Sequence, residues 1–135
     1  MKKTFLIVAA LVSFTAFAFA GDVLGFDVTI DVAPNVLNLQ STGDYVTVHT
    51  NILYDDVDSA TVMLKAGGGS IPLYFSKRDL RDNFVAKFRR DAVIELDFAI
   101  CEDNTFTLTG FYSDGEVFSE AQDILVIDND LKCPR

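Results

Sequence analysis

The chain has 135 residues, 20 of them acidic and 11 basic, and a formal net charge of −9 at pH 7. This acidic balance makes nucleic acid and anionic membrane surfaces poor partners, because both carry negative charge. Half of the residues are apolar, which is enough for one core of ordinary domain size.

Residues 1–20 have the pattern of a cleavable export signal. Two lysines begin the segment, an apolar run follows, and a small-x-small motif predicts cleavage between Ala20 and Gly21. The run is short for a membrane span and no stop-transfer segment follows it, so we expect no span once the signal is removed. Loss of the two lysines leaves nine basic residues against 20 acidic ones, a net charge of −11. We therefore expect one domain over residues 21–135, exported to the periplasm or out of the cell.

Two strands that each bury one face are predicted over residues 26–32 and 46–54. Apolar and polar residues alternate in both segments, which is the period of a half-buried strand. Pro34 cannot donate a ladder hydrogen bond and ends the first strand, and a turn cluster over residues 41–44 precedes the second. The inward positions are Phe26, Val28, Ile30, Val32, Val46, Val48, Thr50, Ile52 and Tyr54. Such strands need a second layer to cover them, which predicts an all-β sandwich.

Shorter strands are predicted over residues 60–65, 71–75 and 84–88. In the second of these, Ile71, Leu73 and Phe75 alternate with Pro72, Tyr74 and Ser76, and the proline indicates an edge position. The three glycines at 67–69 indicate a hairpin connection. A phosphate cradle would need a following helix and a Lys-Ser or Lys-Thr pair, and the sequence has neither here.

Basic residues gather within residues 77–90 and predict a positive strip on an acidic protein. Two interpretations remain open, a solvated strand face with its loop or a docking patch. The next segment, residues 91–98, fits a helix as well as a strand, and we expect a short helix with Asp91 as its N-cap.

The last predicted element is a hairpin of residues 105–112 and 123–128 joined across residues 113–116, with an outward row of threonines on its first strand. Antiparallel pairing brings Cys101 and Cys133, the two cysteines of the chain, to the same edge. In an exported protein such a pair predicts a disulfide. The alternative, a redox-active or metal-binding thiol pair, would need a closer spacing or a histidine partner.

Three stretches together resemble a module of exported bacterial and archaeal proteins. They are a P-x-x-L-N-L-x-S-x-G corner at residues 34–43, a K-F-x-R strand end at residues 87–90 and the hairpin at residues 108–124, where the module has the pattern L-T-G-x-x-x-D-G-x-x-F-x-G-x-D-x-I. The resemblance spans nearly all of residues 26–128. It implies an antiparallel immunoglobulin-like β-sandwich of about seven to eight strands with one short helix, in an accessory domain of uncharacterised function. Many relatives of the module have a calcium-loop-like motif between the middle strands. This chain has residues 78–83 there, with arginines that would oppose a cation, and Glu120 replaces the closing glycine of the hairpin.

Residues able to carry catalysis or bind metal are few. His49 is the single histidine, so a Ser-His-Asp triad would have to use this ring, and no serine motif points to one. A glycosidase would need two carboxylates across a cleft, and a small sandwich offers little cleft. Clustered carboxylates are ligands that calcium uses, although neither acidic cluster matches the twelve-residue calcium loop. The calcium candidates are Asp55, Asp56, Asp58, Asp128 and Asp130.

Three functions follow as hypotheses. The first is a non-enzymatic structural or interaction module of the cell surface, periplasm or an extracellular assembly, with a protein or surface polymer as partner or with self-assembly through edge strands. The second is a ligand- or polysaccharide-binding module in which exposed aromatic residues supply the platform. The candidates for that platform are Tyr45, Tyr54, Tyr74 and Phe111. The third is a hydrolase.

Overall fold

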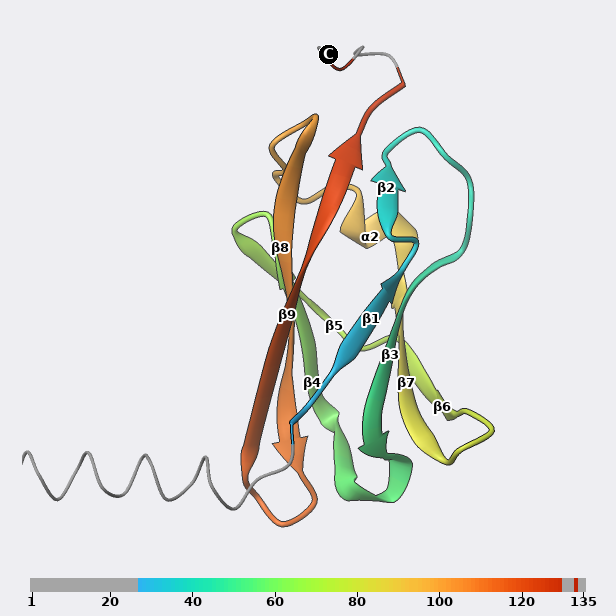
Figure 1. Ribbon diagram of the computed structural model, residues 1–135, viewed down its shortest axis with the longest axis vertical. Helices are drawn as coiled ribbons and strands as arrows, with labels where there is room; N and C mark the ends of the chain where they lie inside the picture. Colours follow the sequence, from blue (N-terminus) through green and yellow to red (C-terminus); the bar gives the residue numbers. More distant parts are fainter. Residues whose placement is uncertain (1–26, 130–132, 134–135) are drawn as a thin grey trace, which may run out of the picture.

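The computed structural model describes residues 27–129 and 133. The described residues form nine strands, a 3₁₀ turn and a short helix (Figure 1). The strands are β1 (Ile30–Ala33), β2 (Val36–Asn38), β3 (Tyr45–Leu53), β4 (Val57–Ala66), β5 (Gly69–Pro72), β6 (Phe75–Arg78), β7 (Asn83–Arg89), β8 (Glu102–Tyr112) and β9 (Val117–Ile127). The turn η1 (Tyr54–Asp56) joins β3 to β4, and the helix α2 (Arg90–Val93) follows β7. The predicted signal segment and its cleavage site lie outside the described residues.

The strands form a sandwich of two sheets, which confirms the predicted all-β class. One sheet has the order β1-β3-β7-β6 and the other the order β2-β9-β8-β4-β5. Strands β1, β3, β7 and β6 take the places of A, B, E and D in an immunoglobulin-type sandwich, and β9, β8 and β4 take those of G, F and C. β2 and β5 are added at the two edges of the second sheet. The described residues thus contain more than the seven or eight strands predicted, and the pairing is not wholly antiparallel, because β2 lies parallel to β9.

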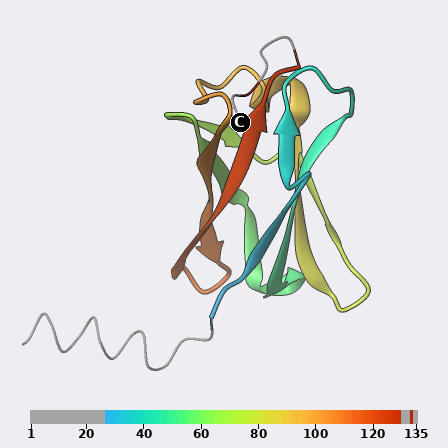
Figure 2. The ribbon, with the colours of Figure 1, turned by 45° about the horizontal axis from the view of Figure 1, so that its top comes forward.

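A proline corner carries the chain from one sheet to the other. β1 pairs with β3, and after Pro34 the chain continues as β2 beside β9. The Ala33–Pro34 peptide bond is cis. Figure 2 shows β1 and β2 following one another along the front of the molecule. The predicted strand end at Pro34 is confirmed, and Leu37 beyond the corner is buried against the core.

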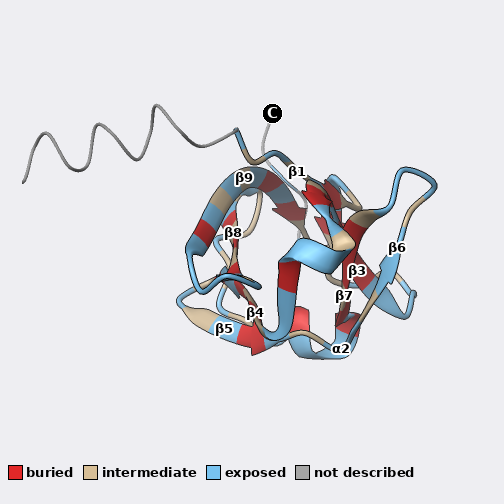
Figure 3. Ribbon diagram, turned by 90° about the horizontal axis from the view of Figure 1, so that it is seen from below, coloured by how far each residue is buried: buried red, intermediate tan, exposed pale blue. Residues whose placement is uncertain are grey.

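Alternating side chains from both sheets fill the core, as the buried positions in Figure 3 show. The predicted inward positions of β3 are buried. The largest fully buried side chains are Phe84, Phe88, Phe106, Leu37, Ile52, Leu64, Leu108 and Ile124. Each such side chain contributes on the order of 1.5 to 3 kcal/mol through its removal from water, so the inward faces of the strands dominate the stability of the fold.

Two hairpins follow the sequence expectations. Ala66 pairs with Gly69, so Gly67 and Gly68 form a two-residue turn, and their φ angles of +55° and +74° are the left-handed values of a type I′ turn. The second hairpin turns at residues 113–116, as predicted. Its second strand begins at Val117 rather than at residue 123, so β8 and β9 pair over nearly their whole length.

A disulfide joins Cys101, just before β8, to Cys133, beyond β9. The S–S distance is 2.09 Å and the Cα atoms lie 5.3 Å apart. This pair was predicted from the antiparallel pairing of the hairpin. The bond is compatible with an oxidising, exported location.

The predicted strand at residues 71–75 is wrong, because the chain changes sheets within it. The amide of Leu73 donates to the carbonyl of Val62 in the five-stranded sheet (3.2 Å). The next amide, that of Tyr74, donates to the backbone carbonyl of Lys87 in the four-stranded sheet (2.9 Å). β5 therefore ends at Pro72, and a new strand, β6, begins at Phe75. Because the alternation restarts, Phe75 faces solvent instead of the core.

The helix predicted over residues 91–98 is confined to α2. Its N-cap is Arg89, and Asp91 binds the Arg89 guanidinium rather than capping the helix. The chain then turns, with the Leu96 amide donating to the carbonyl of Val93 (3.0 Å). No helix in the part of the chain that the structure describes has the length and apolar character needed to cross a membrane.

Candidate functional site: the outer face of the four-stranded sheet

The outer face of the four-stranded sheet brings together aromatic and basic side chains from β3, β7 and the start of β6. Tyr45 of β3 lies opposite Arg89 of β7. Two residues along, Thr47 lies opposite Lys87, which in turn lies opposite Phe75 of β6. We call the following five residues the aromatic–basic patch: Tyr45, Tyr74, Phe75, Lys87 and Arg89.

Three aromatic rings of the patch pack against one another at the surface. The rings of Tyr45 and Tyr74 are stacked, with centroids 5.9 Å apart and planes 25° apart. Phe75 meets these two rings at steep angles, with centroid distances of 5.2 and 5.7 Å. Each such contact contributes about 0.5 to 1.5 kcal/mol, so the rings position one another. They nevertheless remain 37%, 52% and 39% exposed for Tyr45, Tyr74 and Phe75, and present a preformed apolar surface to solvent.

The two cations of the patch lie beside these rings. Lys87 Nζ is 5.9 Å from the centroid of Tyr45 and donates to Thr47 Oγ1 at 2.9 Å. The Arg89 guanidinium is 5.3 Å from the centroid of Tyr74 and also pairs with Asp91 at 2.9 Å. Partial burial and, to a smaller extent, the charge of Lys77 lower the pKa of Lys87. Lys87 is therefore a partly buried ammonium group whose hydrogen-bond partner is a neutral hydroxyl, an arrangement that favours an approaching anion.

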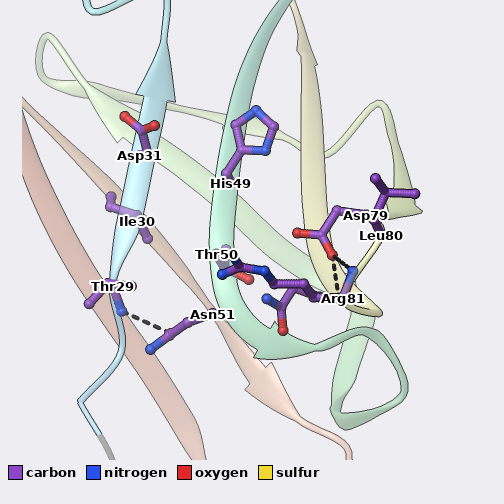
Figure 4. Close-up of a pocket in the computed structure, with 10 residues that line it drawn as sticks. Thr29, Ile30, Asp31, His49, Thr50, Asn51, Asp79, Leu80 and Arg81 are labelled. Carbon is purple, nitrogen blue, oxygen red and sulfur yellow. Dashed lines mark hydrogen bonds between the residues drawn. The ribbon is translucent and has the colours of Figure 1, made fainter.

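An open hollow of about 410 Å³ lies further along the same face, between β1, β3 and the loop from β6 to β7 (Figure 4). His49, Asn51 and Arg81 are among the residues that line it. Asn51 closes one side, because its Oδ1 accepts from the Thr29 amide at 2.9 Å. Opposite, Asp79 Oδ1 accepts from the amides of Arg81 (2.7 Å) and of the residue that begins β7 (3.0 Å). These backbone hydrogen bonds lower the pKa of Asp79, so this carboxylate is a fixed part of the loop.

The hollow and the aromatic–basic patch belong to one continuous surface. Tyr45, Thr47, His49 and Asn51 occupy alternate positions of β3 and point away from the core. Residues two apart on a strand are about 7 Å apart, so this row runs roughly 20 Å from the patch to the hollow. A ligand of several repeating units could contact both.

The predicted positive strip is divided among several environments. Lys77, Lys87 and Arg89 lie on the outer face, and Arg81 lines the hollow. Arg78 instead turns to Asp55, with which it pairs at 2.8 Å. Arg90, the last of the strip, is buried beneath the loop between β2 and β3. The alternation along one strand does not by itself show which basic residues share a face. That becomes clear only from the pairing of β6 with β7, which puts Lys77 and Lys87 on the same face.

Two of the four aromatic residues selected from the sequence come together, namely Tyr45 and Tyr74. Tyr54 is half-buried against Phe84, and Phe111 is exposed on the outer face of the other sheet. Phe75 joins the site although it was not among the aromatic residues selected from the sequence. The signal that could have revealed it is the adjacent pair Tyr74-Phe75, which is separated from Pro72 by Leu73 and lies where the chain changes sheets.

The calcium candidates fall at opposite ends of the sandwich (Figure 1). Asp55 pairs with Arg78, and Asp58 Oδ1 accepts from the Ala60 amide at 3.3 Å. Asp56 lies with them in and after η1, whereas Asp128 follows β9 and accepts from the side chain of Gln40 at 3.1 Å. Asp130 lies outside the described residues. Among the residues described, no three histidine, cysteine or carboxylate side chains are grouped so that they could hold an ion.

His49 lies on the rim of the hollow, opposite Asp31 of β1. In the described part of the chain no serine is hydrogen-bonded to its ring, so the nucleophile–base pair of a triad is not assembled there. The face as a whole presents aromatic rings, hydroxyl groups, cations and the carboxylates of Asp31 and Asp79.

Comparison with known proteins identifies no relative: no protein-family model, curated protein or solved structure matches the chain significantly. Its function is therefore inferred from its own residues.

Proposed function

We propose that this protein is an exported, non-enzymatic interaction module that binds an extended polymer through the outer face of its four-stranded sheet. The export pattern of residues 1–20 and the disulfide support an extracytoplasmic setting, in the periplasm or outside the cell. The resemblance to exported accessory modules is part of the same proposal. The observation that carries it is the aromatic–basic patch, in which three clustered aromatic residues are each more than a third exposed.

Exposure of this kind is informative because clustered apolar surface is costly in water and typically marks an interaction site. The rings are held by one another and by β3, β6 and β7, so little ordering would be needed when a partner binds. The patch also lies on a flat sheet face rather than in a closed cavity. Such a surface suits a polymer that lies across several strands.

The test uses the full chain expressed into an oxidising compartment and measures co-sedimentation with insoluble cell-surface polymers. The variant Tyr45→Ala/Tyr74→Ala is expected to bind at least ten times more weakly than the parent. Phe111→Ala is the matched control, since Phe111 is an exposed aromatic on the other sheet, and it should bind within twofold of the parent. Thermal melting verifies that each variant is folded. Equal losses in both variants, or no binding by the parent, would count against the proposal.

Self-assembly is the second candidate, supported by a separate observation. Val36 of β2 and Leu125 of β9 are paired neighbours at an edge of the five-stranded sheet and are 41% and 36% exposed. An apolar pair at a sheet edge is a plausible contact between copies. Light scattering of the parent and of Leu125→Glu tests this. Assembly predicts a mass above the monomer that Leu125→Glu returns to the monomer.

A further inference from the structure

We infer that the polymer bound by this surface is an acidic polysaccharide, a chain of sugar rings that carries repeated carboxylates. The inference rests on the proposed function, because it names the ligand of the same face. Two features of the patch have to be explained together, the positive charge and the exposed rings.

The positive charge runs against the composition of the chain. Acidic residues outnumber basic ones by 20 to 11. On this face, however, Lys77, Lys87 and Arg89 lie on adjacent strands, and Arg81 lines the neighbouring hollow. Carboxylates lie on this face too, with Asp91 paired to Arg89 and with Asp31 and Asp79 at the hollow. The local excess of positive charge is therefore that of Lys77 and Lys87, and such an excess on an acidic protein attracts anions to one place.

The cations form a row rather than a point. Lys87 and Arg89 are two residues apart on β7 and share one face, so they are about 7 Å apart along the strand. Lys77 lies opposite Val85, a further two residues along. Three cationic side chains therefore follow one another over about 14 Å, of which Arg89 is already paired with Asp91. A row of this kind suits a chain whose carboxylates repeat, whereas a single small anion would use one charge.

Two cations of the row are not neutralised by a carboxylate of the described chain. Within the described part of the chain the ion pairs are Arg78–Asp55 and Arg89–Asp91, so neither Lys77 nor Lys87 has a carboxylate partner there. Lys87 donates instead to the neutral hydroxyl of Thr47. A carboxylate of the ligand would supply the counter-charge that the folded chain does not.

The rings favour a sugar over an acidic peptide. The C–H faces of sugar rings stack on aromatic rings, and hydroxyl groups beside the carboxylates match the phenol groups of Tyr45 and Tyr74. A peptide recognised by strand addition needs a free sheet edge. The free edge beside the patch is that of β6, whereas Tyr45, Lys87 and Arg89 lie on β3 and β7, which are paired on both sides. Strand addition at β6 would therefore leave most of the patch unused.

The experiment measures the affinity of the full chain for polygalacturonate, alginate and hyaluronate, each beside its methyl-esterified form, and for polyglutamate as an acidic polymer without sugar rings. At least one acidic glycan is expected to bind ten or more times tighter than its ester and than polyglutamate. Added salt should weaken that binding, because charge carries part of it. Lys77→Gln/Lys87→Gln should lose at least tenfold. Lys65→Gln is the matched control, an exposed lysine on the other sheet, and should stay within twofold.

The outcomes separate the inference from the proposed function. If an acidic glycan and its ester bind equally well, and Tyr45→Ala/Tyr74→Ala abolishes both, the ligand is not selected for its carboxylates. That result would overturn the inference and leave the proposed binding module intact. If polyglutamate binds as tightly as the glycans, sugar rings are not needed for binding, and the inference that the ligand is a polysaccharide is overturned. Failure to bind any of these polymers would overturn the inference, and binding that neither the tyrosine nor the lysine variants weaken would overturn both. Circular dichroism checks that the variants are folded.

Discussion

Arg90 Nη2 donates to Ser41 Oγ across 2.8 Å and so ties the start of α2 to the loop between β2 and β3. Arg90 is only 8% exposed, and among the described residues its Nε and Nη1 have no hydrogen-bond partner. Gly43 lies against the same side chain, because a Cβ added there would be 3.1 Å from Arg90 Nε. Residues 34–43 and 87–90, which look unrelated in the sequence, thus meet at one buried guanidinium group.

Replacing Arg90 by methionine is expected to raise the free energy of unfolding by about 1 to 3 kcal/mol. The change removes a buried charge with unpaired donors and keeps most of the apolar volume of the side chain. Urea unfolding of the parent and Arg90→Met gives the difference. Arg89→Met is the control, and because Arg89 is exposed it should change stability by no more than about 0.5 kcal/mol. A loss of more than 1 kcal/mol in Arg90→Met would show that the guanidinium stabilises the loop.

Much of the fold could be predicted because the strands carry strong local signals. The alternation of β3, the two glycines of the β4–β5 turn and the edge shared by Cys101 and Cys133 each follow from period 2 or from turn chemistry. The change of sheet at residues 73–74 could not be predicted this way. The amides of Leu73 and Tyr74 donate to carbonyl groups in different sheets. Their acceptors belong to strands that are distant in the sequence, so the local pattern does not reveal them.

The candidate site was only partly predictable for the same reason. Tyr45 and Tyr74 were selected as exposed aromatics and indeed stack. Phe75 was not selected, because the alternation placed it with Ile71 and Leu73, and that alternation does not continue across the change of sheet. The sequence indicated a positive strip, but it could not show that Arg90 turns inward while Lys87 and Arg89 join the rings.

The two glycines of the β4–β5 turn are expected to respond differently to alanine. Both have left-handed φ angles, so each substitution costs about 1 to 2 kcal/mol of backbone strain. At Gly68 nothing lies within 4 Å of the added Cβ, whereas at Gly67 it would lie 2.9 Å from the backbone nitrogen of Asp97. Gly67→Ala should therefore lower the free energy of unfolding by about 1 to 3 kcal/mol more than Gly68→Ala. Equal losses in chemical denaturation would mean that the loop at Asp97 moves away without cost.

Loss of the disulfide is expected to lower the free energy of unfolding by about 3 to 4 kcal/mol. The bond closes a loop with a sequence separation of 32 residues, and the chain-entropy model gives this magnitude for such a loop. Urea unfolding of Cys101→Ser/Cys133→Ser beside the oxidised parent measures it. Reductant should destabilise the parent by a similar amount and leave the double variant unchanged. Full stability of the double variant would show that the hairpin of β8 and β9 holds this edge without the bond.

The stability of the protein should rise with pH in the range set by Lys87. Partial burial and the nearby Lys77 lower the pKa of Lys87 below the ordinary lysine value of 10.5. Between those two pKa values the unfolded chain binds more protons than the folded chain, so the free energy of unfolding increases as pH rises through the folded-state pKa. Urea unfolding at pH values that approach 10.5 from below should show a smaller increase in Lys87→Met than in the parent. Lys65→Met is the control and should follow the parent, and the same increase in all three proteins would contradict the role of Lys87.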